Sequence, residues 1–173
     1  MTLTIPCHGL VLIIGAAGSG KSTFARKHFA ATEIVSSDAL RAAVSDDEAD
    51  QSASGDAFHL LRLIVAKRLR RGRLTVVDAT NVQAKARHGL LAIAMKNSRP
   101  AAAIVLNLPA AICLTRNNAR PDRRVSPDVV EKQVADLTAS LPSLSQEGLQ
   151  KVYVMDNTED IDSVCILRED ASA

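Results

Sequence analysis

The chain is poor in aromatic residues. Its 173 residues include three Phe, one Tyr and no Trp. Stacking of bases on an aromatic platform is therefore excluded as a main mode of nucleic-acid binding. The net charge is only +2, from 21 basic and 19 acidic residues. This balance excludes a protein that attracts polyanions through a globally basic field, so any such contact must come from a local patch.

Cysteines and long apolar runs are also scarce. Cys7, Cys113 and Cys165 form no C-x-x-C pair, which argues against a disulfide framework and against a zinc site. No stretch of 18 apolar residues occurs, and residues 1–6 lack the basic start and apolar stretch of a signal peptide. We therefore expect a cytoplasmic protein with no membrane contact.

The chain does contain a phosphate-binding loop. Residues 15–23 read GAAGSGKST, a match to G-x-x-x-x-G-K-[ST], and the apolar run 10–14 leads directly into them. Glycines let backbone N–H groups turn toward phosphates, Lys21 reaches the β and γ oxygens, and the Ser22 hydroxyl coordinates Mg²⁺. The motif predicts binding of ATP or another nucleoside triphosphate with Mg²⁺, rather than an ordinary glycine-rich turn. The loop residues expected to bind the nucleotide are Gly15, Gly18, Ser19, Gly20, Lys21, Ser22 and Thr23.

Strand and helix patterns alternate along the chain. Segment 45–56 is polar and aperiodic, which predicts a surface loop, and segment 161–168 is ambiguous. Continuously apolar strands separated by helices predict a parallel sheet covered on both faces. We expect one α/β domain over 1–173 with a three-layer P-loop fold around a central parallel sheet. The expected strands are 10–14, 33–36, 74–78, 102–108 and 152–155, and the expected helices begin at 23, 37, 57, 84, 109 and 127.

Asp38 and Arg41 follow the second expected strand and are three residues apart. One helical turn would place both on one face, near the carboxyl edge of the sheet where α/β proteins bind ligands. There a carboxylate can accept the proton of an attacking hydroxyl, and an arginine can hold a second anion. The spacing fits equally well a helix-capping Asp38 and a solvated Arg41.

Asp78 ends an apolar strand, the position from which a Walker-B carboxylate supports the Mg²⁺ shell. The alternative is a turn residue that begins the segment 78–81. With a phosphate loop in the same chain, the metal role is favoured. We therefore expect Ser22 and Asp78 to be the metal-binding residues.

Arginines gather around Pro121. Arg116 and Arg120 are one helical turn apart, and Arg123 follows in a proline-broken turn. Arginines that close over a phosphoryl group can raise the rate of its transfer by a factor of about 10³ to 10⁵. We expect a helical, arginine-bearing lid over about residues 116–126, and the alternative is a basic solvated loop.

Together these motifs resemble the N-terminal kinase module of bacterial polynucleotide kinase-phosphatase, an RNA end-healing enzyme, between residues 10 and 155. The phosphate loop is shared with many unrelated proteins, so other segments carry the resemblance. They are EIVSSD at 33–38, VSDDEADQ at 44–51, GRLTVVDATNVQ at 72–83, NLP at 107–109, and the lid arginines.

The resemblance implies a polynucleotide 5′-hydroxyl kinase that transfers the γ-phosphate of ATP to the 5′-OH end of RNA or DNA in end healing. It implies that Asp38 is the general base. Arg41 would grip the phosphate next to the accepting ribose, and Gln51 would lie near the acceptor.

For the donor, the resemblance implies that Lys21 and Ser22 hold the phosphates and the metal. Arg116 and Arg123 would stabilise the transferring group from the lid, and Arg120 would lie over the nucleotide.

The family's kinase module is usually followed by a phosphatase and a ligase-like domain, and nothing after residue 155 could supply either. The chain is thus expected to be an excised domain or a stand-alone relative, with those activities in a parent protein or in trans. Two other functions stay open. One is a small-molecule kinase for a sugar, nucleoside or antibiotic hydroxyl, and the other is a non-catalytic nucleotide-binding module.

Overall fold

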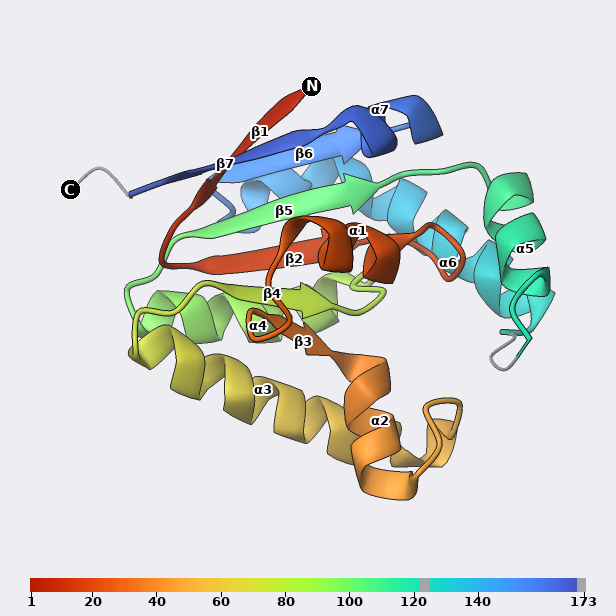
Figure 1. Cartoon of the computed structure of the whole chain (residues 1–173), viewed down its shortest axis with the longest axis horizontal. Coiled ribbons are helices and arrows are strands. Elements are labelled where there is room, and N and C mark those ends of the chain that lie inside the picture. The colour runs from red at the N-terminus through yellow and green to blue at the C-terminus, as the bar shows by residue number, and fades with distance from the viewer. Residues whose placement is uncertain (122–124, 171–173) are drawn as a thin grey trace.

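The computed structural model describes residues 1–121 and 125–170. Its main sheet has five parallel strands: β2 (Leu10–Ile14), β3 (Ile34–Ser36), β4 (Thr75–Asp78), β5 (Ala101–Leu106) and β6 (Lys151–Met155). Their order across the sheet is β3-β4-β2-β5-β6 (Figure 1). Strand β2, the first strand of this sheet along the chain, is therefore central in the sheet, and the phosphate loop leaves from its carboxyl end.

Helices connect the strands. They are α1 (Lys21–His28), α2 (Ser37–Ser45), α3 (Ser54–Arg70), α4 (Ala84–Lys96), α5 (Ala110–Asn118), α6 (Pro127–Ser140) and α7 (Thr158–Ser163), with 3₁₀ turns η1 (Gln51–Ala53) and η2 (Leu141–Gln146). In Figure 1, α1 lies in front of the sheet and α4 behind it. This arrangement confirms the predicted α/β architecture.

The sheet is buried on both faces. Val11 and Ile13 of β2 face a core that includes Phe24 of α1. Leu10, Leu12 and Ile14 of the same strand face a second core, which includes Leu61 of α3 and Leu90 of α4. Because side chains alternate along a strand, both sets must be apolar, and this explains the continuous apolar runs in the sequence.

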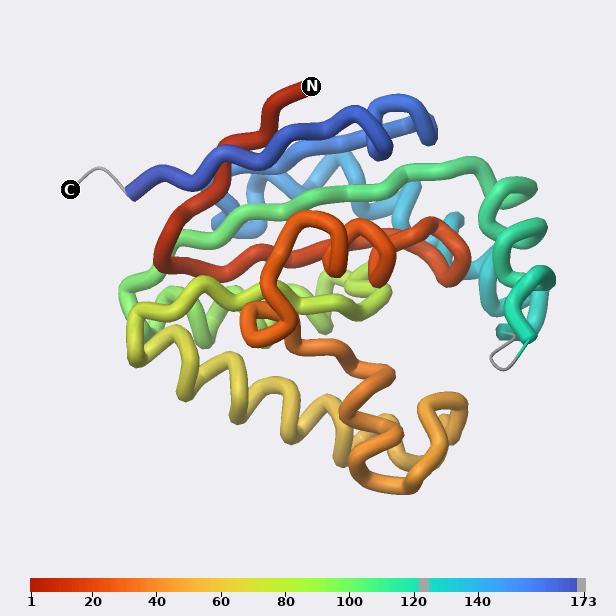
Figure 2. The backbone as a smooth tube through the Cα atoms, viewed as in Figure 1, coloured from red at the N-terminus to blue at the C-terminus, as the bar shows by residue number. Residues whose placement is uncertain are grey.

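A second, two-stranded parallel sheet forms from the ends of the chain. It pairs β1 (Thr2–Pro6) with β7 (Cys165–Glu169), and Figure 2 shows the red start and the blue end of the chain running close together. Tyr153 fastens it to β6, since its hydroxyl donates to the Thr4 carbonyl at 2.8 Å and accepts from the Thr4 N–H at 3.0 Å. The ambiguous segment 161–168 is thus the end of α7 followed by β7.

The prediction of a surface loop over 45–56 is wrong at both ends. Helix α2 continues to Ser45, whose hydroxyl donates to the Arg41 carbonyl at 3.1 Å. The Asp50 side chain accepts from the Ser52 N–H at 2.9 Å and so starts η1, which leads into α3 at Ser54. Polar residues that cap and start helices gave this segment its loop-like composition. In the described parts of the chain, no helix is both long and apolar enough to cross a bilayer.

Candidate active site

The phosphate loop is packed against α5. Gly18 has φ +84°, and a Cβ at this position would lie 2.1 Å from the Cys113 carbonyl oxygen. A Cβ on Gly15 would lie 2.5 Å from Ser19 Oγ, whose side chain is fully buried. Close approach therefore favours glycine at both positions, and at Gly18 the positive φ favours it as well. The Ser19 N–H donates to the Ala16 carbonyl at 3.1 Å, so Ser19 shapes the loop from inside.

Lys21 begins α1 directly after Gly20 and lies inside the loop. Its Nζ donates to the Ala16 carbonyl at 2.8 Å, and the residue is only 9% exposed. Burial lowers the pKa of the Lys21 ammonium to about 8, against the opposing attraction of the Asp78 and Asp38 carboxylates. Because burial disfavours the charged form of Lys21, an anion that binds next to the ammonium would stabilise that form strongly.

One cavity gathers most of the candidate residues. It has a volume of about 540 Å³, within the size range of small-ligand sites, and we call it the inner cavity. Candidate residues that line it come from the phosphate loop, α2, η1, β4 and the arginine segment: Lys21, Ser22, Asp38, Arg41, Gln51, Asp78 and Arg120.

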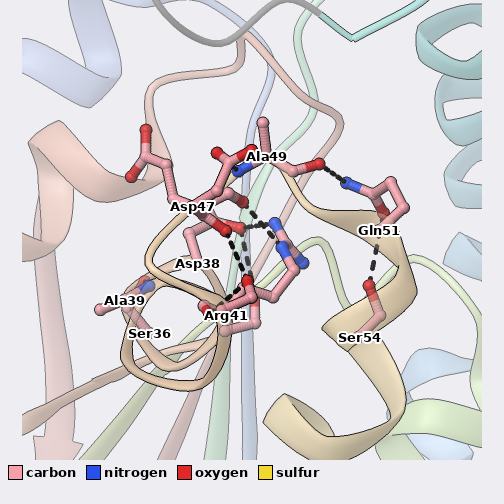
Figure 3. Close-up of polar contacts among 11 residues, drawn as sticks. Ser36, Asp38, Ala39, Arg41, Asp47, Ala49, Gln51 and Ser54 are labelled. Atoms are coloured by element: carbon pink, nitrogen blue, oxygen red, sulfur yellow. Dashed lines mark hydrogen bonds and ion pairs between the residues drawn. The ribbon is translucent and has the colours of Figure 1, made fainter.

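Asp38 and Arg41 form an ion pair on the first turns of α2 (Figure 3). The Arg41 Nε also donates to the Glu48 carbonyl at 2.8 Å, and Arg41 is only 6% exposed. Ser36 is the residue that caps α2, by accepting from the Ala39 N–H. The alternative of a capping Asp38 and a solvated Arg41 is therefore wrong, because Arg41 is buried and joined to both the carboxylate and the loop after α2.

Gln51 lies on η1, at the rim of the inner cavity. Its Oε1 accepts from the Ser54 hydroxyl at 3.4 Å, and its Nε2 donates to the Ala49 carbonyl at 3.3 Å (Figure 3). The side chain itself is exposed. It can therefore meet a molecule that enters the cavity.

Ser22 and Asp78 supply oxygens on one side of the inner cavity. Asp78 ends β4 beside Ser36 and Ile13 of the neighbouring strands, and it is 5% exposed. Within the described part of the chain its carboxylate accepts no hydrogen bond. Both residues also line a neighbouring cavity of about 820 Å³, which Thr23 lines as well.

These oxygens fit a nucleotide-bound Mg²⁺. Among residues 1–121 and 125–170, no three His, Cys, Asp or Glu side chains are grouped to hold a metal ion alone. Mg²⁺ commonly keeps several waters and takes one or two protein oxygens together with substrate phosphates. Ser22 and Asp78 would be those protein ligands.

The arginine segment reaches the phosphate loop. A Cβ on Gly20 would lie 3.6 Å from Arg116 Nη1, so this guanidinium lies over the loop. Arg116 and Arg120 both line a cavity of about 290 Å³ on the outer side of the loop, and Arg120 also lines the inner cavity. Arg123, the third predicted lid arginine, lies outside the described residues.

Two further polar side chains position the site. Gln133 of α6 accepts from the Ala17 N–H of the phosphate loop at 2.8 Å. The fully buried Asn117 donates to the Val125 carbonyl at 2.7 Å and accepts from its N–H at 3.1 Å. Sequence reasoning missed both, and for Gln133 no signal was available because its partner is 116 residues away.

A comparison with protein families finds that the family described as "AAA domain" matches residues 10–144. The chain belongs to this AAA domain family. The match contains β2, the phosphate loop, Asp38, Asp78 and the arginine segment. No curated protein matches the sequence.

Solved structures similar to this AAA domain include a chain of the Pnkp1/Rnl/Hen1 RNA repair complex, with a TM-score of 0.69 and 22% identity over 81% of this chain and 47% of that chain. The AAA domain thus spans about half the length of that relative. A gluconokinase from Sinorhizobium meliloti 1021 has a TM-score of 0.56 and 16% identity over 91% and 87% of the chains. A shikimate kinase from Acinetobacter baumannii has a TM-score of 0.52 and 16% identity over 89% and 87%.

These similarities confirm the P-loop kinase fold, and they confirm the resemblance to polynucleotide kinase at the level of the fold. The AAA domain therefore shares its fold with these kinases. The family match and the phosphate loop together imply nucleotide binding.

Proposed function

We propose that the chain is an ATP-dependent polynucleotide 5′-hydroxyl kinase, which acts on the ends of RNA or DNA. The observation that carries this proposal is the ion pair of Asp38 and Arg41 in the inner cavity, which Lys21 and Ser22 also line. A carboxylate and a guanidinium side by side suit an acceptor that presents a hydroxyl and a phosphate together. The 5′-end of a nucleic-acid strand has this chemistry.

The phosphate loop would hold the donor. Lys21 would bind the β and γ phosphates, since a bound phosphate compensates the cost of keeping its ammonium charged in a buried place. Mg²⁺, held by Ser22 and Asp78, would neutralise charge on the same phosphates. Arg116 and Arg120 would enclose the donor from the outer side of the loop.

Asp38 would orient the 5′-hydroxyl and take its proton. In the transfer, a bond forms between the 5′ oxygen and the γ phosphorus, and the bond to the β–γ bridging oxygen breaks. The proton passes to the Asp38 carboxylate, and ADP leaves with the electron pair of the broken bond. Arg116, with Arg123, would stabilise the charge on the moving group.

Arg41 would select a strand over a free sugar. Its Nε and one Nη are engaged with Glu48 and Asp38, which fixes the guanidinium in the cavity wall. The other Nη makes no hydrogen bond to a described residue. It is therefore placed to bind the phosphate that follows the accepting ribose, with Gln51 beside it at the rim.

The similarity to a chain of an RNA repair complex supports this proposal. Because the chain spans about half of that relative, we propose that phosphatase and ligase steps are supplied by other domains or proteins. The gluconokinase and shikimate kinase neighbours support the second candidate, a small-molecule kinase.

The test is an acceptor panel with Mg²⁺ and γ-labelled ATP. It contains a 5′-hydroxyl RNA strand, the matching DNA strand, both strands with a 5′-phosphate, and gluconate, shikimate and free nucleosides. We expect label only on the two 5′-hydroxyl strands. Label on a small molecule and on no strand would establish the second candidate, and tight ATP binding without any transfer would indicate a binding module.

A further inference from the structure

The inner cavity continues into a second one. This second cavity has a volume of about 530 Å³, and the two share Phe58, Thr80, Val129 and Gln133 as wall residues. Four shared residues from three separate segments show that the cavities adjoin along a common wall. We call the two cavities together the α3–α6 groove.

The groove follows helix α3 away from Asp38. Ser54, Phe58 and Arg62 are spaced by four residues and so lie on one face of α3. Ser54 lines only the inner cavity, Phe58 lines both, and Arg62 lines only the second. Arg62 is therefore about 12 Å along the helix from Ser54, beyond the wall residues that the cavities share.

Helix α6 forms the opposite wall in the same order. Ser126, just before α6, lines only the inner cavity, Val129 lines both, and Lys132 and Asp136 line only the second. The loop after β4 forms the floor, with Thr80 in both cavities and Gln83 in the second. The groove thus leads from the Asp38–Arg41 pair outward between two helices.

The far end of the groove carries an uncompensated positive charge. Lys132 pairs with Asp136 at 2.8 Å, which neutralises both. Arg62 is exposed and makes no hydrogen bond or ion pair with a described residue. The Arg62 guanidinium lies next to Gly89 of α4, since a Cβ at that position would be 3.6 Å from Arg62 Nε. Because residue 89 is a glycine, no side chain there covers the guanidinium.

We propose that the second cavity is the subsite for the second nucleotide of the acceptor strand, counted from its 5′ end, and that Arg62 contacts the phosphate that follows it. This inference rests on the proposed function, because Asp38 and Arg41 must hold the first nucleotide. Phe58 is the single aromatic side chain on the described groove walls. Phosphate contact and the shape of the groove, rather than base stacking, therefore supply the binding.

The test compares acceptors of increasing length with a 5′-hydroxyl: a nucleoside 3′-monophosphate, a dinucleotide with a 3′-phosphate, a trinucleotide and a 12-mer. We expect kcat/KM to rise up to the dinucleotide with a 3′-phosphate, which carries the phosphate after the second nucleotide, and then to level off. Each contact to a single-strand phosphate steepens the fall of log affinity with log salt by about 0.7. At 0.1 M salt, one such contact therefore strengthens binding by about fivefold relative to 1 M salt. Arg62→Ala should lower kcat/KM for the 12-mer, relative to kcat/KM for the nucleoside 3′-monophosphate, by about fivefold. It should also make the salt dependence of 12-mer binding less steep, by about 0.7 in the slope.

Arg70→Ala is the matched control, because Arg70 is also exposed on α3, makes no hydrogen bond to a described residue and does not line the groove. It should leave the ratio and the slope unchanged. Equal kcat/KM for all lengths, or equal effects of the two substitutions, would overturn the subsite while the kinase proposal stands. If the unsubstituted protein phosphorylates no strand of any length, both proposals fail.

Discussion

At the scale of single residues, the buried ammonium of Lys21 couples nucleotide binding to pH. Its pKa is lowered to about 8 by burial, and a bound phosphate would favour the charged form and raise that pKa. Above pH 8, binding should therefore take up a proton, and ADP affinity should fall by up to about tenfold per pH unit. Calorimetric titration at several pH values, in buffers of different ionisation enthalpy, measures both the affinity and the proton uptake.

Lys21→Met supplies the control for this pH dependence. The substituted side chain has a similar length and no titratable group, so ADP should bind more weakly and with no proton uptake between pH 7 and 9.5. An affinity of the unsubstituted protein that stays constant across this range would contradict the role of Lys21.

Arg41 has two tasks at the same scale, since it holds Asp38 and is proposed to bind the acceptor phosphate. Arg41→Ala should raise the KM for a 5′-hydroxyl strand by about tenfold or more, which corresponds to the loss of a charge-assisted hydrogen bond. The KM for ATP should change little. Steady-state kinetics with each substrate varied in turn separate the two constants.

Arg41→Lys sharpens this measurement. It keeps the positive charge but cannot reach Asp38 and the Glu48 carbonyl together with a phosphate in a planar fork. We expect it to recover only part of the acceptor affinity. If both substitutions raise the two KM values equally, Arg41 acts on the fold of the site rather than on the acceptor.

At the scale of elements, Asn117 ties together the two ends of the segment that carries Arg120. Its two hydrogen bonds join the end of α5 to Val125, just before α6, and Arg120 lies between these points. Asn117→Ala should lower kcat by about tenfold through misplacement of the arginines and reduce the free energy of unfolding by about 1–3 kcal/mol. Asn118→Ala is the matched control, because Asn118 is exposed and without a hydrogen bond to a described residue.

Elements also show what sequence patterns can predict. The apolar runs at β2, β4 and β5 predicted buried strands, because strands covered on both faces are apolar along most of their length. The pair Asp38 and Arg41 followed from helical spacing, and the structure confirms that they lie together. The contacts of Gln133 to the phosphate loop and of β1 to β7 depend on tertiary packing between distant segments, which leaves no local period in the sequence.

At the scale of the whole molecule, a buried ion pair connects the C-terminal third to the site. Arg87 of α4 is fully buried and donates to Glu147 at 2.5 and 2.8 Å and to the Asn81 carbonyl at 2.8 Å. Asn81 in turn donates to the Ile13 carbonyl at 2.9 Å, one residue before the end of the strand that enters the phosphate loop. These hydrogen bonds therefore fix the loop after β4, which forms the floor of the α3–α6 groove, against the central strand β2.

Glu147→Ala should lower the free energy of unfolding by about 3–5 kcal/mol, because it leaves the Arg87 charge buried without a partner. Urea denaturation followed by circular dichroism measures this change. Glu131→Ala, which removes an exposed acid from α6, should change it by less than about 0.5 kcal/mol. Similar losses in the two variants would show that the buried pair does not contribute as described.

The central claim is that Asp38 accepts the proton of a 5′-hydroxyl while the phosphate loop holds ATP. The most direct test is the transfer of γ-labelled phosphate to a 5′-hydroxyl strand by the unsubstituted protein and by Asp38→Asn, together with the ATP affinity of each. We predict that the substitution slows transfer by about 10² to 10⁴ and leaves ATP affinity within a few-fold. Transfer by Asp38→Asn at the unsubstituted rate, or no transfer by either protein, would contradict the claim.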